Sequence, residues 1–518
     1  MNGSSRDDRA LAYESPDRLK SMVAQKLPKD GIGIEGILQE FSDLIAKYSI
    51  AQFDDGYLAF PDSGNALPAM AADIFSKFLN QNLIAFSRSA PIATFIEIQL
   101  IEWLRQLIGH EHKDLDAIES LADVSGMVTT GGHMANHIAV LTALNTAFPN
   151  IKTEGLTSLN EKPVIILAGD ISHYSFVTAA HHLGLGRDSI VSVASTGDYR
   201  TDARNVEEVL ANPPKDTRPF MVVGIAGNAK TTQIDDIEEL ADVCEQHNTW
   251  LHIDACHGGS LLFSKKYRSM LKGIERADSV SIDPHKGLFM AYPLSFILFR
   301  RRGDLVVYTR YEEEVRDGSS WDLGFITPFY GSRGFESLKL YSTIKCFGID
   351  GLAEIIDERQ DLVLNMADVL KGNENICMLN DVEFYRMSFV YLPRGIREDI
   401  TSRQLSMQQR TDIRDLIEEY THRINEELYV DGRLILDEFK LSDLNNSTKL
   451  NLDGKMTVMS ATLGNPNQST EKIEQSFQLL FDKCQTYRKE YQLRYRKIVT
   501  ENARSTTNKT GSYGPAGW

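Results

Sequence analysis

The feature of this sequence that most constrains its fold is a regular alternation of short apolar runs and helical patterns between residues 127 and 300. Helix-like stretches such as Phe176–Leu183 and Asp236–His247 separate runs that are rich in β-branched residues. The runs are Val164–Ala168, Ile190–Ala194, Met221–Ala226, Trp250–Asp254, Val280–Asp283 and Phe296–Arg300. This alternation predicts an α/β fold with a mostly parallel central sheet and helices on both faces. Ligands of such sheets bind at the carboxyl ends of the strands, so residues directly after a strand are the first functional candidates.

The remaining sequence predicts flanking segments. Residues 1–110 are expected to be an N-terminal helical segment, with helices at Ala66–Leu79 and Ile92–Ile108. Residues 111–350 are expected to form the large domain, and residues 351–500 a smaller C-terminal α+β domain. Residues 501–518 are rich in Ser, Thr, Asn and Gly, which predicts a flexible tail. The charged stretch 308–330 is expected to bury little apolar surface and to act as a lid.

Composition argues against several classes of function. The 518 residues carry a formal charge of −17, whereas nucleic-acid binders hold phosphates with Lys- and Arg-rich surfaces. The five cysteines are far apart and form no C-x-x-C pattern, so neither a disulfide framework nor a zinc site is expected. The first 30 residues lack the apolar core of a signal peptide, and no apolar run approaches membrane-spanning length. We therefore expect a cytoplasmic protein with no metal, nucleic acid or membrane as a partner.

A glycine turn opens an apolar helix at Gly131-Gly132-His133. The free backbone N–H groups and the positive dipole end of such a helix suit a phosphate group. A turn that only begins a helix is the alternative interpretation.

Three further candidates each follow a predicted strand. Asp254 ends one strand, where its carboxylate could pair with a protonated pyridine nitrogen, as a pyridoxal-phosphate electron sink requires. Lys286 follows the next strand and could form an imine if its surroundings lower its pKa. His173 lies beyond the first strand, where its ring could stack on an aromatic cofactor. Taken singly, each has an ordinary alternative: a turn-capping Asp, a surface Lys and a helix-capping or surface His.

Together these motifs resemble the group II pyridoxal-phosphate-dependent decarboxylases, the family of the aromatic-amino-acid, glutamate, histidine and tyrosine decarboxylases. The resemblance spans residues 54–370. The residues that carry it are Phe60-Pro61 with Pro68-Ala69-Met70, Ser172-His173-Tyr174-Ser175, His252-Ile253-Asp254-Ala255, Asp283-Pro284-His285-Lys286, and Gly331-Ser332-Arg333 with Leu338-Lys339-Leu340.

The resemblance implies the aspartate-aminotransferase-like fold (fold type I) and a homodimer with shared active sites, to which the N-terminal segment contributes. It implies decarboxylation of an L-amino acid to an amine and CO₂, with pyridoxal 5′-phosphate held as a Schiff base on Lys286. Lys286, His173 and Asp254 are the implied catalytic residues. The implied cofactor-binding residues are Gly131, Gly132, His133, His173, Asp254, Ala255, Cys256, Asp283, His285 and Lys286. The implied substrate-pocket residues are Phe60, Asp62, Phe86 and Arg333, and Leu83–Phe86 is similar to a segment that reaches the neighbouring subunit's pocket.

Departures from the family pattern leave alternatives open. His133 stands where a small hydroxyl residue is usual, and the segment around Thr231 and Thr232 replaces a Gly-Thr-Thr motif. The mobile-loop tyrosine that protonates the α-carbon in the family could be Tyr308, Tyr311 or Tyr330. Relatives that lack this tyrosine form aldehydes, so an aldehyde synthase, a carbon–carbon lyase and a catalytically silent dimeric relative are the alternatives. Asp62 stands where a neutral polar residue is more usual, and either repels anionic substrates or caps the helix beginning near Ala66.

Overall fold

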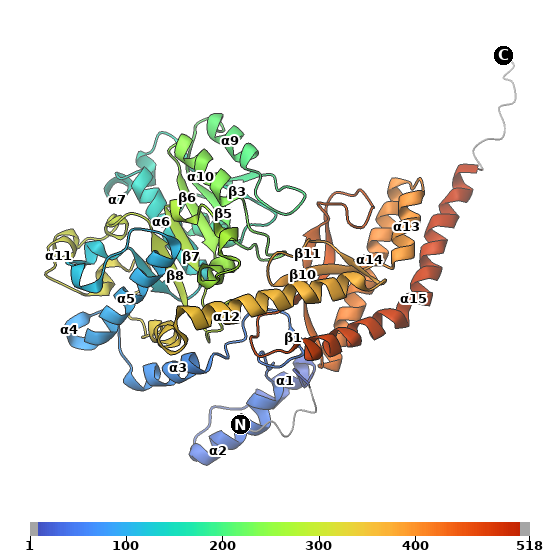
Figure 1. The fold of residues 1–518 in the computed structure, drawn as a ribbon, viewed down its shortest axis with the longest axis horizontal. Helices are drawn as coiled ribbons and strands as arrows, with labels where there is room; N and C mark the ends of the chain where they lie inside the picture. The colour runs from blue at the N-terminus through green and yellow to red at the C-terminus, as the bar shows by residue number, and fades with distance from the viewer. Residues whose placement is uncertain (1–8, 508–518) are drawn as a thin grey trace.

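In the computed structural model, which describes residues 9–507 and their side chains through Thr500, a seven-stranded sheet forms the centre of the larger part (Figure 1). Its order is β2-β8-β7-β6-β5-β3-β4. The strands are β2 (Gly126–Thr129), β3 (Lys162–Ala168), β4 (Ile190–Val193), β5 (Thr217–Ile225), β6 (Trp250–Ala255), β7 (Ser279–Ile282) and β8 (Ser295–Phe299). All six predicted strands are confirmed. Strands β4, β3, β5, β6 and β7 are parallel, and β8 runs antiparallel to both neighbours.

Helices cover both faces of this sheet, as the alternation predicts. They are α6 (Gly132–Ala147), α7 (Ile151–Glu154), α8 (Ser175–His182), α9 (Ala203–Ala211) and α10 (Ile237–Gln246). On one face, Asn136 of α6 hydrogen-bonds His252 of β6. On the other, a Cβ at Gly224 of β5 would lie 2.9 Å from the Leu240 side chain of α10. Gly224 pairs with Ile253, and side chains of successive strand residues point to opposite faces, so α6 and α10 lie on opposite sides.

The N-terminal segment contains α1 (Pro16–Val23), α2 (Gly33–Glu40), a π-helix (Phe41–Ala46), β1 (Tyr57–Leu58), α3 (Leu67–Leu79), α4 (Phe86–Ser89) and α5 (Pro91–Ile108). Ser15 caps α1 by accepting a hydrogen bond from the Arg18 N–H. Helices α1 and α2 project from the body of the molecule in Figure 1. The segment is not purely helical, because β1 pairs with β11 (Ile435–Ser442) of the C-terminal part.

The C-terminal part is built on a second sheet of order β1-β11-β12-β10-β9. Its remaining elements are β9 (Ile376–Met378), β10 (Arg386–Tyr391), β12 (Lys455–Thr462), α13 (Arg394–Ser402), α14 (Met407–Asp431) and α15 (Thr470–Thr507). The long helix α12 (Ser337–Gly372) runs from below the large sheet into the C-terminal part in Figure 1 and is kinked at Gly348. The expected boundary at residue 350 therefore falls inside a helix, and the division into domains stays a prediction.

The segment 303–335, which includes the charged stretch 308–330, has regular structure of its own. It contains the short helix α11 (Glu312–Arg316) and single turns of 3₁₀ helix at Asp304–Val306 and Leu323–Ile326. The expectation that its charged stretch buries little apolar surface is wrong, because Val315, Leu323 and Ile326 are buried in the main core. These side chains anchor the segment, and its action as a lid stays a prediction.

The ends of the chain bear on two other expectations. Helix α15 continues through Thr507, and the rest of the expected flexible tail, 508–518, lies outside the described residues. Within residues 9–507, no helix has both the length and the apolar character needed to cross a membrane.

Candidate functional site

A cavity of about 340 Å³ lies at the carboxyl ends of β6, β7 and β3, the edge where the sequence places its candidates. Nine of the ten predicted cofactor-binding residues line it: Gly131, Gly132, His133, His173, Asp254, Cys256, Asp283, His285 and Lys286. The tenth, Ala255, is buried in β6 beside the cavity. Four separate segments after strands therefore converge on one space.

Lys286 lies on the cavity wall beside a buried carboxylate. Its Nζ is 3.0 Å from Asp283 Oδ2. Burial lowers the pKa of Lys286, but Asp283, Cys256 and Asp254 outweigh burial, and the pKa is raised above its ordinary value. A lowered pKa is the condition given above for imine formation by Lys286, and the surrounding carboxylates produce the opposite shift because they stabilise the ammonium form.

Asp254 is held as a carboxylate at the end of β6. Its Oδ2 accepts a hydrogen bond from Asn136 Nδ2 at 2.9 Å, and its Oδ1 accepts one from the Cys256 N–H at 3.2 Å. Burial raises the pKa of Asp254, but the opposing effect of His173, His252 and Lys286 is larger. The pKa of Asp254 therefore lies below its ordinary value. An ionised carboxylate in this position can keep a proton on a nitrogen base placed opposite it.

The turn before α6 provides a tightly packed cradle. A Cβ at Gly132 would lie 2.4 Å from Cys256 Sγ and 2.8 Å from Asp283 Oδ2, so no larger residue fits without displacing them. The first backbone N–H groups of α6 have no carbonyl partner within the helix and face the cavity end of the sheet. These amides suit a phosphate group.

His173 contributes a neutral ring. Burial lowers its pKa, with Asp254 opposing and Lys286 reinforcing the shift. Its Nδ1 accepts a hydrogen bond from the Ser175 N–H at 3.2 Å, which orients the imidazole. The ring lies 4.3 Å from that of Tyr174.

Sequence reasoning assigned no role to several residues that the fold brings to the cavity. Asn136 hydrogen-bonds Asp254, and its only local signal is its position one turn into the phosphate-cradle helix. His257 lines the cavity and hydrogen-bonds Tyr385, which comes from the C-terminal part. Asn228 and Tyr292 also line it. Nothing local in the sequence connects His257 with Tyr385.

The four predicted substrate-pocket residues have different surroundings. Neither Asp62 nor Phe60 lines the cavity, but Asp62 is largely buried near Lys286 and receives a hydrogen bond from Tyr292, which does line it. Phe60 lies under the guanidinium of Arg386, 5.9 Å from it. Phe86 packs edge-on against Phe95 of α5, away from the cavity lining.

Arg333 is committed to a buried ion pair. Its two terminal nitrogens donate to both oxygens of Glu97, at 2.6 and 2.7 Å. It does not line the cavity of its own chain. This bidentate geometry ties the segment after α11 to α5.

The three candidate loop tyrosines are also engaged elsewhere. Tyr308 donates to the Ile326 carbonyl at 3.4 Å, and Tyr330 donates to the Val128 carbonyl at 2.7 Å. Tyr311 stacks on Phe325 with ring centres 4.0 Å apart. None of the three lines the cavity among the described residues.

The segment that departs from the family's Gly-Thr-Thr motif reaches the cavity through other residues. Gly227, Asn228 and Ala229 line it, whereas Thr231 and Thr232 do not. Thr231 accepts a hydrogen bond from Asn228 Nδ2 at 2.8 Å. Thr231 therefore stabilises the turn through Asn228, and neither threonine contacts the cavity.

The residues present fit pyridoxal phosphate. The cavity combines an amide cradle at Gly132, an ionised carboxylate at Asp254 and an amine at Lys286. Asp283 Oδ1 is buried at the cavity and has no partner among the described residues, so the site has polar capacity beyond the protein's own contacts. An aromatic ring with a phosphate at one side and a basic nitrogen at another matches these groups.

Comparison with known proteins agrees with this chemistry. The model of the pyridoxal-dependent decarboxylase conserved domain matches residues 16–392. The chain is 28% identical over 406 residues to mouse cysteine sulfinic acid decarboxylase, covering 77% of this chain and 79% of that protein. It is 25% identical over 395 residues to L-2,4-diaminobutyrate decarboxylase of Acinetobacter baumannii, covering 73% of this chain and 75% of that protein.

The fold agrees as well. The crystal structure of mouse CSAD superposes with a TM-score of 0.79 at 24% identity, over 92% of this chain and 93% of that one. The expected fold type I is therefore confirmed, as are the family and the cofactor that the motifs implied. From its sequence match, its fold and a cavity that fits the cofactor, the chain belongs to the pyridoxal-dependent decarboxylase family, the pyridoxal-phosphate enzymes that remove the carboxyl group of amino acids.

Proposed function

We propose that this chain decarboxylates an L-amino acid to an amine, with Lys286 holding pyridoxal phosphate as a Schiff base. The observation that carries this proposal is the convergence of Lys286, Asp254 and the Gly132 turn on one cavity. His173 supplies the flat ring against the cofactor face, and the amides of Gly132 and His133 hold the phosphate.

The bound cofactor supplies an electron sink for the electron pair left when the carboxylate departs. Asp254 keeps the proton on the pyridine nitrogen because its own pKa is held below the ordinary value. Asn136 fixes the direction of that carboxylate through the 2.9 Å hydrogen bond to Oδ2. His257 and Tyr385 close the cavity on the side of the C-terminal part and help exclude water.

As a free amine, Lys286 would have a second role. Asp283 and Asp254 raise its pKa, so the released amine carries a proton on the cavity wall. That proton is available to the α-carbon, and its delivery there yields an amine. The aldehyde-forming alternative is favoured by one observation, namely that no candidate loop tyrosine lines the cavity of its own chain among the described residues.

Asp62 supports a substrate without a negative side chain. It does not cap α3, because Ala66 occupies the N-cap position and the helix has no side-chain cap. Its Oδ1 is buried without a partner in the described part of the chain. Lys286 is the only Lys or Arg among the described residues that line the cavity. An acidic side chain would therefore meet carboxylates and no free cation, a cost on the order of several kcal/mol.

The two relatives are named for substrates whose side chains carry opposite charges, cysteine sulfinic acid and 2,4-diaminobutyrate. The substrate is therefore identified by experiment. The experiment is to incubate 2,4-diaminobutyrate, an aromatic amino acid and glutamate with the wild type and with Asp62→Asn. Carbon dioxide, amine, aldehyde and ammonia are measured. We expect amine and CO₂ in equal amounts, glutamate as the poorest substrate, and at least a ~10-fold gain for glutamate relative to diaminobutyrate in Asp62→Asn.

Two results would contradict this proposal separately. Aldehyde and ammonia in place of amine would show an aldehyde synthase. Glutamate as the best wild-type substrate would refute the role of Asp62 and leave decarboxylation intact. Asp170→Asn is the matched control, since this carboxylate is engaged with Ser195 and does not line the cavity.

We also propose that the protein is a homodimer, and the apolar surface of the N-terminal segment supports this. On α3, Phe78 is 84% exposed, Leu67 75% and Ile74 72%. Helix α2 adds exposed Ile34 and Leu38. Exposed apolar faces of this kind mark protein interfaces. A shared interface would also give Phe86 and the segment 308–330 a neighbouring site to reach.

The substitution Phe78→Asp is expected to shift the protein from twice the chain mass towards one chain mass in analytical ultracentrifugation, because a buried charge opposes association. Leu493→Asp is the control, since Leu493 is an exposed apolar residue on α15. A monomeric wild type, or a dimer unaffected by Phe78→Asp, would exclude this interface. A cytoplasmic location belongs to the same proposal, and the five free, unpaired cysteines support it.

A further inference from the structure

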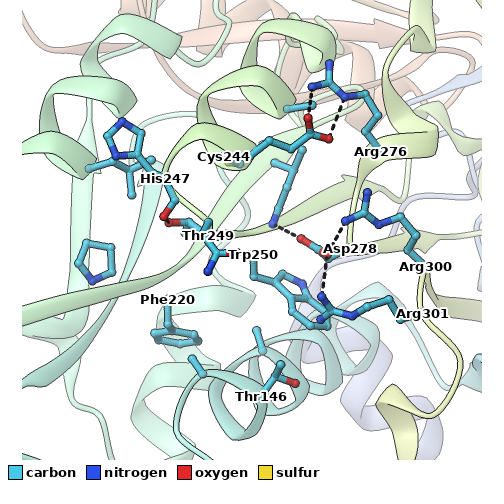
Figure 2. Close-up of a pocket in the computed structure, with 18 of the residues that line it drawn as sticks. Thr146, Phe220, Cys244, His247, Thr249, Trp250, Arg276, Asp278, Arg300 and Arg301 are labelled. Atoms are coloured by element: carbon cyan, nitrogen blue, oxygen red, sulfur yellow. Dashed lines mark hydrogen bonds and ion pairs between the residues drawn. The ribbon is translucent and has the colours of Figure 1, made fainter.

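A second, larger cavity of about 630 Å³ lies at the opposite edge of the central sheet from the catalytic cavity (Figure 2). It is lined where β5 and β6 begin and where β8 ends, by residues that include Phe220, Trp250 and Arg300. Strand β6 spans the sheet between the two spaces, with Trp250 in this cavity and Asp254 in the catalytic one. The volume of this second cavity falls within the range of small-molecule sites.

Four arginines line this cavity although the whole chain carries a formal charge of −17. The guanidinium of Arg218, an exposed residue of β5, makes no ion pair or hydrogen bond among the described residues and is held 4.7 Å above the ring of Phe148. Stacking of this kind orients a guanidinium and leaves all its N–H donors free. Arg218 is therefore a preoriented cation without an anion.

Two further arginines share one carboxylate, as Figure 2 shows. Asp278 Oδ1 lies 3.1 Å from Arg300 and 3.7 Å from Arg301. The other oxygen of Asp278 accepts the Leu251 N–H at 2.9 Å. Asp304 is a second partner of Arg301, at 3.5 Å. Each guanidinium has five N–H donors, so both retain donors that these contacts do not use.

The remaining charges of the cavity are balanced. Arg276 is paired with both Glu245 and Asp242 and is therefore committed to the protein. His247 lines the cavity, and its Nε2 is enclosed without a partner among the described residues. Aromatic surface is also present, since Arg301 lies 5.1 Å from the ring centre of Trp250. The cavity therefore presents guanidinium N–H donors that the protein does not use, next to aromatic rings.

We propose that this cavity binds a small phosphate-bearing anion, held by Arg218, Arg300 and Arg301. Guanidinium groups match phosphate oxygens in geometry and charge, and their hydrogen bonds to phosphate are about twice as strong as neutral ones. Inorganic oligophosphate and nucleotides share this chemistry, and the experiment separates them.

A chain of buried hydrogen bonds connects this cavity to the catalytic carboxylate. Trp250 Nε1 donates to Ser279 Oγ at 2.9 Å, and Ser279 Oγ lies 2.9 Å from His252 Nδ1. His252 Nε2 lies 3.2 Å from Asn136 Oδ1, and Asn136 Nδ2 donates to Asp254 Oδ2 at 2.9 Å.

The direction of every link in this chain follows from chemistry. Burial lowers the pKa of His252 to about 4, so its ring is neutral. The Asn136 carbonyl can only accept, so His252 Nε2 carries the proton and Nδ1 accepts from the Ser279 hydroxyl. A displacement of Trp250 by a bound anion is therefore transmitted through this chain to Asp254, although Asn136 Nδ2 also donates to Ser175 Oγ at 3.0 Å.

The binding experiment uses the holoenzyme and isothermal titration calorimetry with pyrophosphate, tripolyphosphate, ATP and adenosine. We expect one site per chain for the phosphate compounds and none for adenosine. Arg218→Gln and Arg301→Gln are each expected to raise Kd at least ~10-fold, and Arg394→Gln, which removes an exposed arginine of α13, leaves Kd unchanged. ATP binding tighter than tripolyphosphate would identify a nucleotide, and equal binding an inorganic anion.

The proposal is overturned if no phosphate compound binds, or if Arg218→Gln and Arg301→Gln bind as the wild type does. Unchanged melting temperatures of the variants exclude misfolding as the cause of lost binding. The link to Asp254 rests on the function proposed above and has its own readout, a ligand-induced change in the visible absorption of the bound cofactor. We expect Ser279→Ala to lose that change while retaining the calorimetric site. Because calorimetry does not depend on Asp254, failure of the cavity and failure of the catalytic assignment are distinguishable.

Discussion

Replacing Lys286 by alanine is expected to reduce turnover by at least about a thousandfold, because the enzyme loses the amine that bonds the cofactor. The fold should persist, since the Lys286 side chain pairs with Asp283 and lies at the cavity wall rather than in the apolar core. Steady-state rates with the best substrate, together with circular dichroism, measure the two effects.

Borohydride treatment of the wild type followed by peptide mapping identifies the attachment point directly. We expect the reduced adduct on Lys286 and its absence in Lys286→Ala. Lys230→Ala is the matched control, because Lys230 is another half-buried lysine near the carboxyl edge of the sheet and it hydrogen-bonds the Asp170 carbonyl. An adduct on Lys230 or on any other lysine would refute the assignment.

The second large effect is expected for Asp254→Asn, with a fall in turnover of about three orders of magnitude. An amide at this position carries no charge and cannot hold the proton on the pyridine nitrogen. Asn136 could still donate to the amide oxygen of the substituted side chain, which has nearly the same shape as that of Asp254. The substitution therefore tests the effect of the negative charge with little change in packing. The visible absorption of the bound cofactor should shift as well, which a purely structural role would not produce.

Asp235→Asn provides the control for burial. Asp235 is also a buried aspartate, in the connection between β5 and α10. It accepts hydrogen bonds from the N–H groups of Ile225 and Thr201, and burial raises its pKa to about 6. Its substitution is expected to change stability without shifting the cofactor absorption. Wild-type activity in Asp254→Asn would show that another group pairs with the ring.

The sequence by itself determined the large sheet and the chemistry at its edge. Apolar, β-branched runs separated by amphipathic helices specify βαβ units locally, and each predicted strand from Val164 to Phe299 is present. Lys286, Asp254 and His173 could be identified for the same reason. Each follows a strand of one parallel sheet, and parallel strands bring their carboxyl ends to a common edge.

Only the tertiary structure decided which side chains support these groups. Asn136 and Asp254 are 118 residues apart, His257 and Tyr385 are 128 apart, and Glu97 and Arg333 are 236 apart. No local pattern encodes such pairs, because their partners meet through packing of distant elements. The antiparallel direction of β8 and the anchoring of Val315 in the core have the same origin. The raised pKa of Lys286 also arises from the tertiary structure, because a pKa depends on the charges that the fold places around a group and not only on its neighbours in sequence.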